Sequence, residues 1–521
     1  MSTTERSWES FGAGPLDVEK LAEMANRFFS AVPGSAPEPL APQPTPDAFG
    51  LADTRLPYAP PLPPLVGDVT RFPDLAVVGA AGIRVPGLEH LFAPPVVPPA
   101  AAGGLDIPLI RRDFPILSET VNGRPLVWLD NAATTQKPRA VMERLKYFYE
   151  HENSNIHRAA HELAARATDA YEAAREKVRL FLNARSANEC VFVRGATEAI
   201  NLVAQSWGRQ NIGKDDEIIV SWLEHHANIV PWQQLAEEKG ARLRVIPVDE
   251  DGQILIDEYA RLLGPKTKLV SFTQVSNALG TITPAPQIAA MAHAAGARVL
   301  VDGAQSVSHM RTDVQALDSD WFVFSGHKVF GPTGIGVLHG KEDLLNRTQP
   351  WQGGGNMIAD VTFERTQYQA APSRFEAGTG NIADAVGLGA ALDYVMKLGI
   401  DAIAAYEHHL LEYATRLMKD VPGLRLIGTA PKKAGVLSFV LQGYRTEDVG
   451  NALNKEGIAV RSGHHCAQPI LRRFGLESTV RPSLAFYNNC EDVDRLIAVL
   501  VRLSDRRPGP GLPDPGLRRQ G

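Results

Sequence analysis

The chain has few cysteines, no long apolar run and no large excess of charge. Three cysteines in 521 residues are too few for a disulfide framework, so we expect free thiols in a reducing compartment. No segment approaches the roughly 20 apolar residues of a membrane-spanning helix, and residues 1–10 resemble neither a secretory signal nor an anchor. A net charge of −6 provides no basic surface for nucleic acid. We therefore expect a cytoplasmic protein without nucleic-acid or membrane partners.

Proline is concentrated at the start of the chain, where residues 1–100 hold 18 of the 38 prolines. Proline fixes φ and removes a backbone donor, so we predict a disordered extension over residues 1–105. Apolar residues within 16–29 and 75–85 interrupt this extension. They either bind a partner or form nascent structure that docks on the chain itself. Four prolines and four glycines predict a second disordered segment at 506–521.

From residue 107 onward, short apolar runs alternate with amphipathic segments, which is typical of α/β proteins. The runs are continuously apolar, so they predict a mostly parallel sheet that is buried on both faces. The pattern changes near residue 387 and predicts a large domain over 106–386 and a smaller α+β domain over 387–505. The predicted strands are 190–193, 217–221, 243–248, 268–272, 298–301, 321–324, 436–441 and 458–460, and the predicted helices include 168–183, 197–210, 285–295 and 491–503.

Two of these strands end close to a lysine and an acid. Lys328 follows the strand 321–324, and Asp302 follows the strand 298–301. Ligands of open α/β sheets bind at the carboxyl ends of the strands, so both side chains are expected to face one crevice. A lysine near glycines is more often a solvated loop residue. Pyridoxal phosphate, however, requires this pair, because the amine holds the aldehyde and the carboxylate keeps the pyridine nitrogen protonated.

Four motifs together resemble the SUF-type (group II) cysteine desulfurases of the class V aminotransferase family, over about residues 107–502. The resemblance implies fold type I of the pyridoxal phosphate enzymes, with a mostly parallel seven-stranded sheet in the large domain and residues 106–135 packed on the small one. It also implies a homodimer with shared active sites. The expected reaction converts L-cysteine to L-alanine and keeps the sulfur as an enzyme persulfide for an acceptor protein in iron–sulfur metabolism. The motifs are Glu224-His225-His226-Ala227-Asn228-Ile229-Val230-Pro231-Trp232, Asp302-Gly303-Ala304-Gln305, Ser325-Gly326-His327-Lys328 and Arg461-Ser462-Gly463-His464-His465-Cys466.

The resemblance implies roles for individual residues of this chain. Lys328 would carry the cofactor, Asp302 would face its ring nitrogen, His225 would stack on the ring and Gln305 would bond its phenolic oxygen. Arg481 and Asn277 would bind the substrate carboxylate. The implied phosphate contacts are Ala196 and Thr197 at a helix N-terminus, Ser325, His327, and Thr379 of the neighbouring subunit. We expect no metal, because His225 and His226 lack a third ligand at metal spacing.

Two positions depart from the family pattern. Gly380 stands where many relatives have proline, so the loop that carries Thr379 loses rigidity. Ala196 stands where relatives commonly have threonine, which removes one possible phosphate contact.

Cys466 is the candidate nucleophile, because it follows Gly463, His464 and His465 in a polar loop where a thiol is expected to be exposed. Such a loop would also have to move, to bring the persulfide out to an acceptor. Cys190 lies inside a predicted strand, and for it and for Cys490 we expect an inert apolar role.

The proline-rich extension is similar to those that target cysteine desulfurases into encapsulin shells as cargo, which makes a shell a further expected partner. Two other functions remain open. One is a selenocysteine lyase or another class V pyridoxal phosphate enzyme. The other is a persulfide-carrying scaffold whose catalytic core is vestigial.

Overall fold

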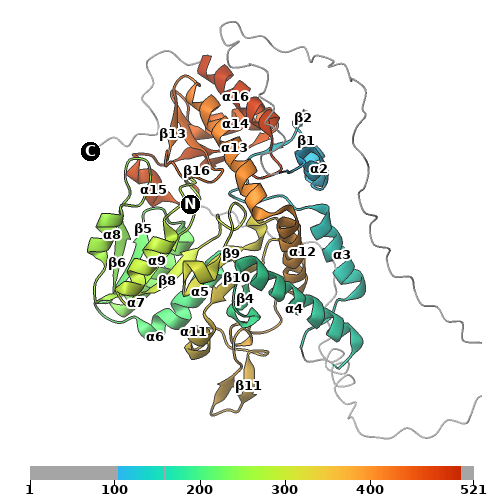
Figure 1. Ribbon diagram of the computed structural model, residues 1–521, viewed down its shortest axis with the longest axis vertical. Coiled ribbons are helices and arrows are strands. Elements are labelled where there is room, and N and C mark those ends of the chain that lie inside the picture. The colour runs from blue at the N-terminus through green and yellow to red at the C-terminus, as the bar shows by residue number, and fades with distance from the viewer. Residues whose placement is uncertain (1–103, 158–159, 506–521) are drawn as a thin grey trace, which may run out of the picture. The chain divides into compact units, whose positions relative to one another are not determined.

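The computed structural model describes residues 104–157 and 160–505. The predicted extension up to residue 103, with both of its apolar segments, and the C-terminal segment 506–521 lie outside the described residues. The largest sheet has seven strands in the order β4-β10-β9-β8-β7-β5-β6 (Figure 1). Its strands are β4 (Cys190–Val193), β5 (Glu217–Ser221), β6 (Arg242–Ile246), β7 (Thr267–Thr273), β8 (Arg298–Asp302), β9 (Trp321–Ser325) and β10 (Gly336–Gly340).

The strand pairing confirms the predicted mostly parallel sheet. The strands β5, β6, β7, β8 and β9 pair in parallel, and only β10 runs against its two neighbours, β4 and β9. All six strands predicted for this sheet are present. The seventh, β10, was not among the predicted strands. The chain is therefore an α/β protein with the large sheet of fold type I.

Both faces of the large sheet are buried, because successive strand residues contribute to two separate apolar clusters. On β9, Phe322 belongs to one cluster with α4, α9 and α12, whereas Val323 belongs to the other with α5 and α7. Continuous burial on both sides explains why the strand sequences are continuously apolar. The helices are α2 (Ile107–Arg112), α3 (Arg139–His151), α4 (Glu162–Leu182), α5 (Ala196–Val203), α6 (Arg209–Asn211), α7 (Val230–Lys239), α8 (Ile256–Leu262), α9 (Ala285–Ala294), α10 (Val314–Leu317), α11 (Glu342–Arg347), α12 (Ile382–Leu398), α13 (Ile400–Lys419), α14 (Thr446–Lys455), α15 (Gln468–Arg473) and α16 (Cys490–Asp505).

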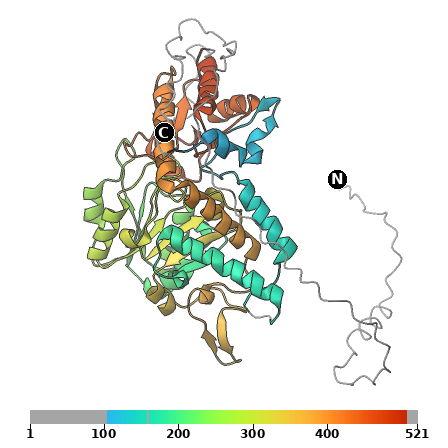
Figure 2. The ribbon, with the colours of Figure 1, turned by 45° about the vertical axis from the view of Figure 1, so that its right-hand side comes forward.

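The predicted helix 197–210 is not one regular helix. A π-helical turn at Ala204–Gly208 separates α5 from the short α6. The predicted boundary at residue 387 falls within α12, which lies against α3 and α4 (Figures 1 and 2). We therefore propose that the division between the two predicted domains lies after α12, near Gly399.

A second sheet of four strands precedes the C-terminal helix, with the order β13-β14-β17-β16. The beginning of the described chain contacts this region, since β3 pairs with β15 and the Arg111 guanidinium donates to an Asp492 oxygen over 2.9 Å. The remaining strands are β1 (Thr120–Val121), β2 (Arg124–Pro125), β3 (Val127–Trp128), β11 (Ile358–Val361), β12 (Thr366–Tyr368), β13 (Leu424–Ile427), β14 (Ser438–Leu441), β15 (Ile458–Ala459), β16 (Arg461–Gly463) and β17 (Thr479–Arg481). Within the described ranges, no helix combines the length and the apolar character needed to cross a membrane.

Candidate functional site

The carboxyl ends of the parallel strands open into a cavity of about 200 Å³. Five strand ends supply its polar groups directly or through the turn that follows, as expected for an open α/β sheet. Eleven of the twelve residues predicted for the site line this cavity: Ala196, Thr197, His225, Asn277, Asp302, Gln305, Ser325, His327, Lys328, Cys466 and Arg481.

Asp302 and Lys328 face the same cavity from adjacent strands. Asp302 is the last residue of β8, and Lys328 lies on a short helical turn directly after β9. Burial lowers the pKa of Lys328 to about 8, although the nearby charge of Asp302 opposes this shift. At neutral pH the Lys328 amine is therefore far closer to its neutral, nucleophilic form than an exposed lysine. Burial also raises the pKa of Asp302.

Gly303, which directly follows Asp302, allows the end of β8 to pack closely against β9. A Cβ atom on Gly303 would lie 1.9 Å from the Phe322 ring, so no other residue fits without displacing β9.

Helix α5 begins at the edge of the cavity, which Ala196 and Thr197 line. The Ala196 N–H donates to Ser325 Oγ over 2.9 Å, and Thr197 is exposed beside it. The Ser325 hydroxyl accepts this bond and keeps its own hydrogen for another acceptor. Hydroxyls next to a helix N-terminus can bind an anionic group.

His225 lines the cavity as a neutral imidazole. Burial is the main reason that its pKa falls to about 3, and the Lys328 charge acts in the same direction. Its Nδ1 accepts a hydrogen bond from the Ala227 N–H over 3.0 Å, so the ring proton resides on Nε2. The ring is thus fixed in orientation and in tautomer.

Glu224 anchors the segment that carries His225. The sequence did not predict this role of Glu224. It is fully buried, and burial raises its pKa to about 8. Its carboxyl oxygens accept from Asn228 Nδ2 over 2.6 Å and from the Thr273 N–H over 3.0 Å. The residue joins the end of β5 to the end of β7.

Arg481 ends β17, with its guanidinium buried at the cavity wall. Its Nη1 donates to the Asn277 carbonyl over 2.9 Å, while Nη2 lies 3.4 Å from Asp130 Oδ1. Burial lowers the pKa of Arg481 to about 10, so it stays a cation at neutral pH. Nε of Arg481 and Oδ1 of Asn277 have no hydrogen-bond partner among the described residues, although both are buried.

Cys466 has the exposed side chain that was predicted. His465 and Cys466 both adopt left-handed backbone conformations, with φ of 53° and 52°. Such conformations are costly for residues other than glycine and persist only where surrounding contacts hold them. Cys466 lines the same cavity as Lys328 and Arg481.

The other two cysteines differ from Cys466. Cys190 is buried in β4, and burial raises the pKa of its thiol to about 12. Cys490 is half-buried at the start of α16, where burial also raises its pKa. Neither lines the cavity.

Thr379 is the predicted residue that does not reach the cavity. It is exposed in a separate hollow near Tyr171 and Trp351. A buried ion pair between Arg175 and Glu376, with 2.6 Å between Nη1 and Oε1, holds the segment that precedes it. The role of Thr379 at a neighbouring subunit stays a prediction.

Three further cavity or wall residues had no predicted role. Arg461 and His465 line the cavity, and Asp130 joins Arg461 to Arg481 through ion pairs at 3.2 Å and 3.4 Å. Burial lowers the pKa of His465 to about 2, and its Nδ1 is buried without a partner. Arg461 and His465 belong to the same sequence motif as Cys466. Their closeness to Cys466 in the sequence was the signal that could have identified them.

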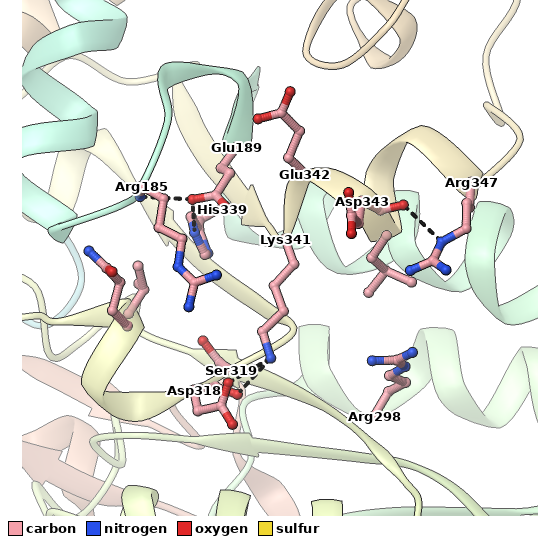
Figure 3. Close-up of a pocket in the computed structure, with 13 residues that line it drawn as sticks. Arg185, Glu189, Arg298, Asp318, Ser319, His339, Lys341, Glu342, Asp343 and Arg347 are labelled. Atoms are coloured by element: carbon pink, nitrogen blue, oxygen red, sulfur yellow. Dashed lines mark hydrogen bonds and ion pairs between the residues drawn. The ribbon is translucent and has the colours of Figure 1, made fainter.

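A larger cavity of about 370 Å³ lies at the opposite, amino-terminal edge of the sheet (Figure 3). It is lined by charged side chains that pair with one another. Lys341 lies 2.7 Å from Asp318, His339 lies 3.4 Å from Glu189, and Arg298 lies 2.8 Å from Asp320. The first two pairs are visible in Figure 3. We regard this hollow as an ion-pair cluster and not as the reaction site.

Across residues 104–157 and 160–505, His, Cys, Asp and Glu side chains nowhere gather in a group of three that could hold a metal ion.

Comparison with known proteins identifies the family. The model for class-V aminotransferases matches residues 127–496. A cysteine desulfurase of Synechococcus elongatus is 73% identical over 78% of this chain, and this chain spans 64% of that protein's length. A cysteine desulfurase of Dickeya dadantii is 52% identical, over 76% of this chain and 96% of the relative.

Solved structures agree with the sequence comparison. A crystal structure of a cysteine desulfurase from Escherichia coli, which carries an S-sulfonic acid, is 40% identical with a TM-score of 0.72, over 76% of this chain and 98% of that one. Together with the cavity at the strand ends, these matches show that the chain belongs to the class-V aminotransferase family.

Proposed function

We propose that the chain is a pyridoxal phosphate-dependent cysteine desulfurase of the SUF type (group II), which holds sulfur from L-cysteine as a persulfide on Cys466. One observation carries this proposal: the exposed Cys466 thiol borders the cavity that contains Lys328 and Arg481. An amine, a carboxylate-binding cation and a thiol are the three groups that the reaction needs. The relatives named cysteine desulfurase support the same activity.

The cavity fits pyridoxal phosphate, which is the cofactor of this family's desulfurases. Three buried polar atoms at its wall, on Asn277, His465 and Arg481, have no partner among the described residues, as expected where a polar ligand completes the site. When bound, the cofactor supplies an aldehyde for the Lys328 amine and a ring that withdraws electrons from the substrate.

Different residues of the cavity would contact different parts of the cofactor. Asp302 would hold a proton on the ring nitrogen, and the neutral His225 would pack on the ring. Thr197, Ser325 and His327 would bind the phosphate, and Gln305 would donate to the phenolic oxygen. Ala196 lies beside them, but its N–H is already bonded to Ser325. The Gln305 amide already donates one hydrogen to the Ala132 carbonyl over 2.6 Å, which orients the other.

The reaction then follows from the remaining side chains. Arg481 and Asn277 bind the carboxylate of L-cysteine, and the Lys328 amine removes the proton from its Cα. The Cys466 thiolate attacks the substrate sulfur, so that a sulfur–sulfur bond forms as the carbon–sulfur bond breaks. One proton is added to Cβ in place of the sulfur, which balances the proton that the substrate thiol loses, and a second returns to Cα. L-alanine then leaves, while Cys466 keeps the sulfur as a persulfide. No external oxidant or reductant is needed.

Incubation with L-cysteine tests this function. We expect one alanine per sulfur released, and peptide mapping by mass spectrometry should find the extra sulfur on Cys466. A selenocysteine lyase would instead turn over selenocysteine far faster than cysteine. A scaffold with vestigial catalysis would carry a persulfide supplied from outside but release no alanine.

Replacing Arg481 by lysine is expected to lower kcat/KM for cysteine about 100-fold, mainly through KM. Lysine keeps the charge but loses the planar pair of donors that grips a carboxylate. Steady-state kinetics would measure the effect. The matched control is Arg445→Lys, because Arg445 is an exposed arginine that pairs with Asp448 at the start of α14 and does not line the described cavity. An unchanged KM in Arg481→Lys would remove this residue from the substrate site.

We also propose that the enzyme acts as a homodimer and passes its sulfur to an acceptor protein. Thr379 supports the dimer, because its exposed position outside its own cavity suits a contact with the partner's phosphate. Analytical ultracentrifugation would test the association state.

The N-terminal extension is proposed to package the enzyme inside an encapsulin shell. Its proline-rich composition with two apolar segments supports a targeting role, and it has no part in the chemistry above. Deleting residues 1–100 should leave turnover within about twofold, because the described cavity residues, from Ala132 to Arg481, include all the groups proposed for the chemistry except Thr379. The same deletion should abolish co-purification with a co-expressed shell. Equal loading of the truncated and full chains would contradict the packaging role.

A further inference from the structure

His226 contacts the turn that carries Cys466, whereas its neighbour His225 faces the cofactor cavity. The His226 N–H donates to the Cys466 carbonyl over 2.7 Å. The Gln468 N–H donates to His226 Nε2 over 3.2 Å. The His226 ring also stacks on the His464 ring, with centroids 5.7 Å apart and planes 29° apart. One histidine thus holds the turn, residues 464–468, at three successive points.

The turn needs such support, because two of its residues are strained. His465 and Cys466 both have left-handed φ values, and neither is a glycine. The turn's other side is fixed by Asn277, whose Nδ2 donates to the His465 carbonyl over 2.7 Å. Without contacts on both sides, the backbone would relax toward commoner conformations and the thiol would leave its present position.

We propose that His226 is a positioning residue that latches the Cys466 turn over the cavity through its neutral imidazole. The inference rests on the proposed function, in which Cys466 must meet the substrate sulfur. The latch requires Nε2 to be an acceptor, which only the neutral ring provides. Burial lowers the pKa of His226, and the charges of His464 and Arg472 act in the same direction, so the ring stays neutral at pH 7.

Two variants of the holoenzyme separate the latch from simple packing. His226→Phe keeps an aromatic ring but loses the acceptor, while His226→Gln places an acceptor near the position of Nε2. Hydrogen exchange of the peptide covering 464–471 should quicken about tenfold in His226→Phe and less than threefold in His226→Gln. The control is His408→Phe, because His408 is an exposed histidine that pairs with Glu412 on α13.

The same variants should differ in chemistry. Persulfide formation in a single turnover should slow about tenfold in His226→Phe, with KM within twofold and the cofactor absorbance unchanged. His226→Gln should recover most of the rate. Wild-type exchange and rate in His226→Phe would overturn the latch, and so would a glutamine variant as impaired as the phenylalanine variant. If the wild-type protein acquires no persulfide at all, the desulfurase proposal fails, and the exchange measurement still decides whether His226 holds the turn.

Discussion

Replacing Cys466 by alanine is expected to abolish persulfide formation and alanine release, by about a thousandfold or more, while the cofactor stays bound. The thiol is the only cysteine side chain among the described residues that borders the cavity. The residues proposed to hold the cofactor, among them Lys328 and Asp302, belong to other segments of the cavity wall and are unchanged in this variant. The visible absorbance of the cofactor should therefore match the wild-type protein, and mass spectrometry should find no added sulfur.

Cys490→Ala provides the matched control for this variant. Cys490 is half-buried at the start of α16 and does not line the cavity, so its loss should leave sulfur release near the wild-type rate. Alanine release from Cys466→Ala at a comparable rate would show that another group accepts the sulfur. The nucleophile assignment would then be wrong, even if the family and the cofactor stand.

The strands of the large sheet were predictable because burial on both faces leaves continuous apolar runs. The predicted segments 190–193 and 217–221 match β4 and β5 residue for residue. The strand that was not predicted, β10, has a glycine at each end, and its His339 lies between Leu338 and Gly340. A buried histidine interrupts the apolar signal, and it is tolerated there because Glu189 lies 3.4 Å from it, which no local pattern reveals.

The site residues that directly follow a strand could be predicted from the sequence. Lys328 and Asp302 each follow an apolar run, and adjacent parallel strands bring them to one edge. Asp130 was not predictable in this way, because its partner Arg481 is 351 positions away in the chain. Its importance comes from tertiary contact alone.

The conformation of the Cys466 turn also could not be predicted from the sequence. Positive φ values usually indicate glycine or asparagine, yet His465 and Cys466 both adopt them. The contacts that compensate come from His226 and Asn277, which lie in distant segments. The motif therefore indicates a thiol in a polar loop, and only the fold shows that the loop is held under strain.

Replacing Lys328 by alanine is expected to remove covalent attachment of the cofactor and to lower turnover by about a thousandfold or more. Burial lowers the pKa of this amine to about 8, and no second lysine of the described residues lines the cavity. The visible absorbance of the attached cofactor should disappear after dialysis. Persulfide on Cys466 should be lost as well, which distinguishes this variant from Cys466→Ala.

Lys433→Met tests whether the loss of any buried lysine would release the cofactor and lower turnover. Burial lowers the pKa of Lys433 to about 8 too, but its amine donates to the Gly428 carbonyl away from the cavity. This variant should keep the bound cofactor and the wild-type rate. Borohydride reduction and peptide mapping would show whether Lys328→Ala still carries covalent cofactor on another lysine. That result would contradict the assignment, because Lys328 would then not be the reactive amine.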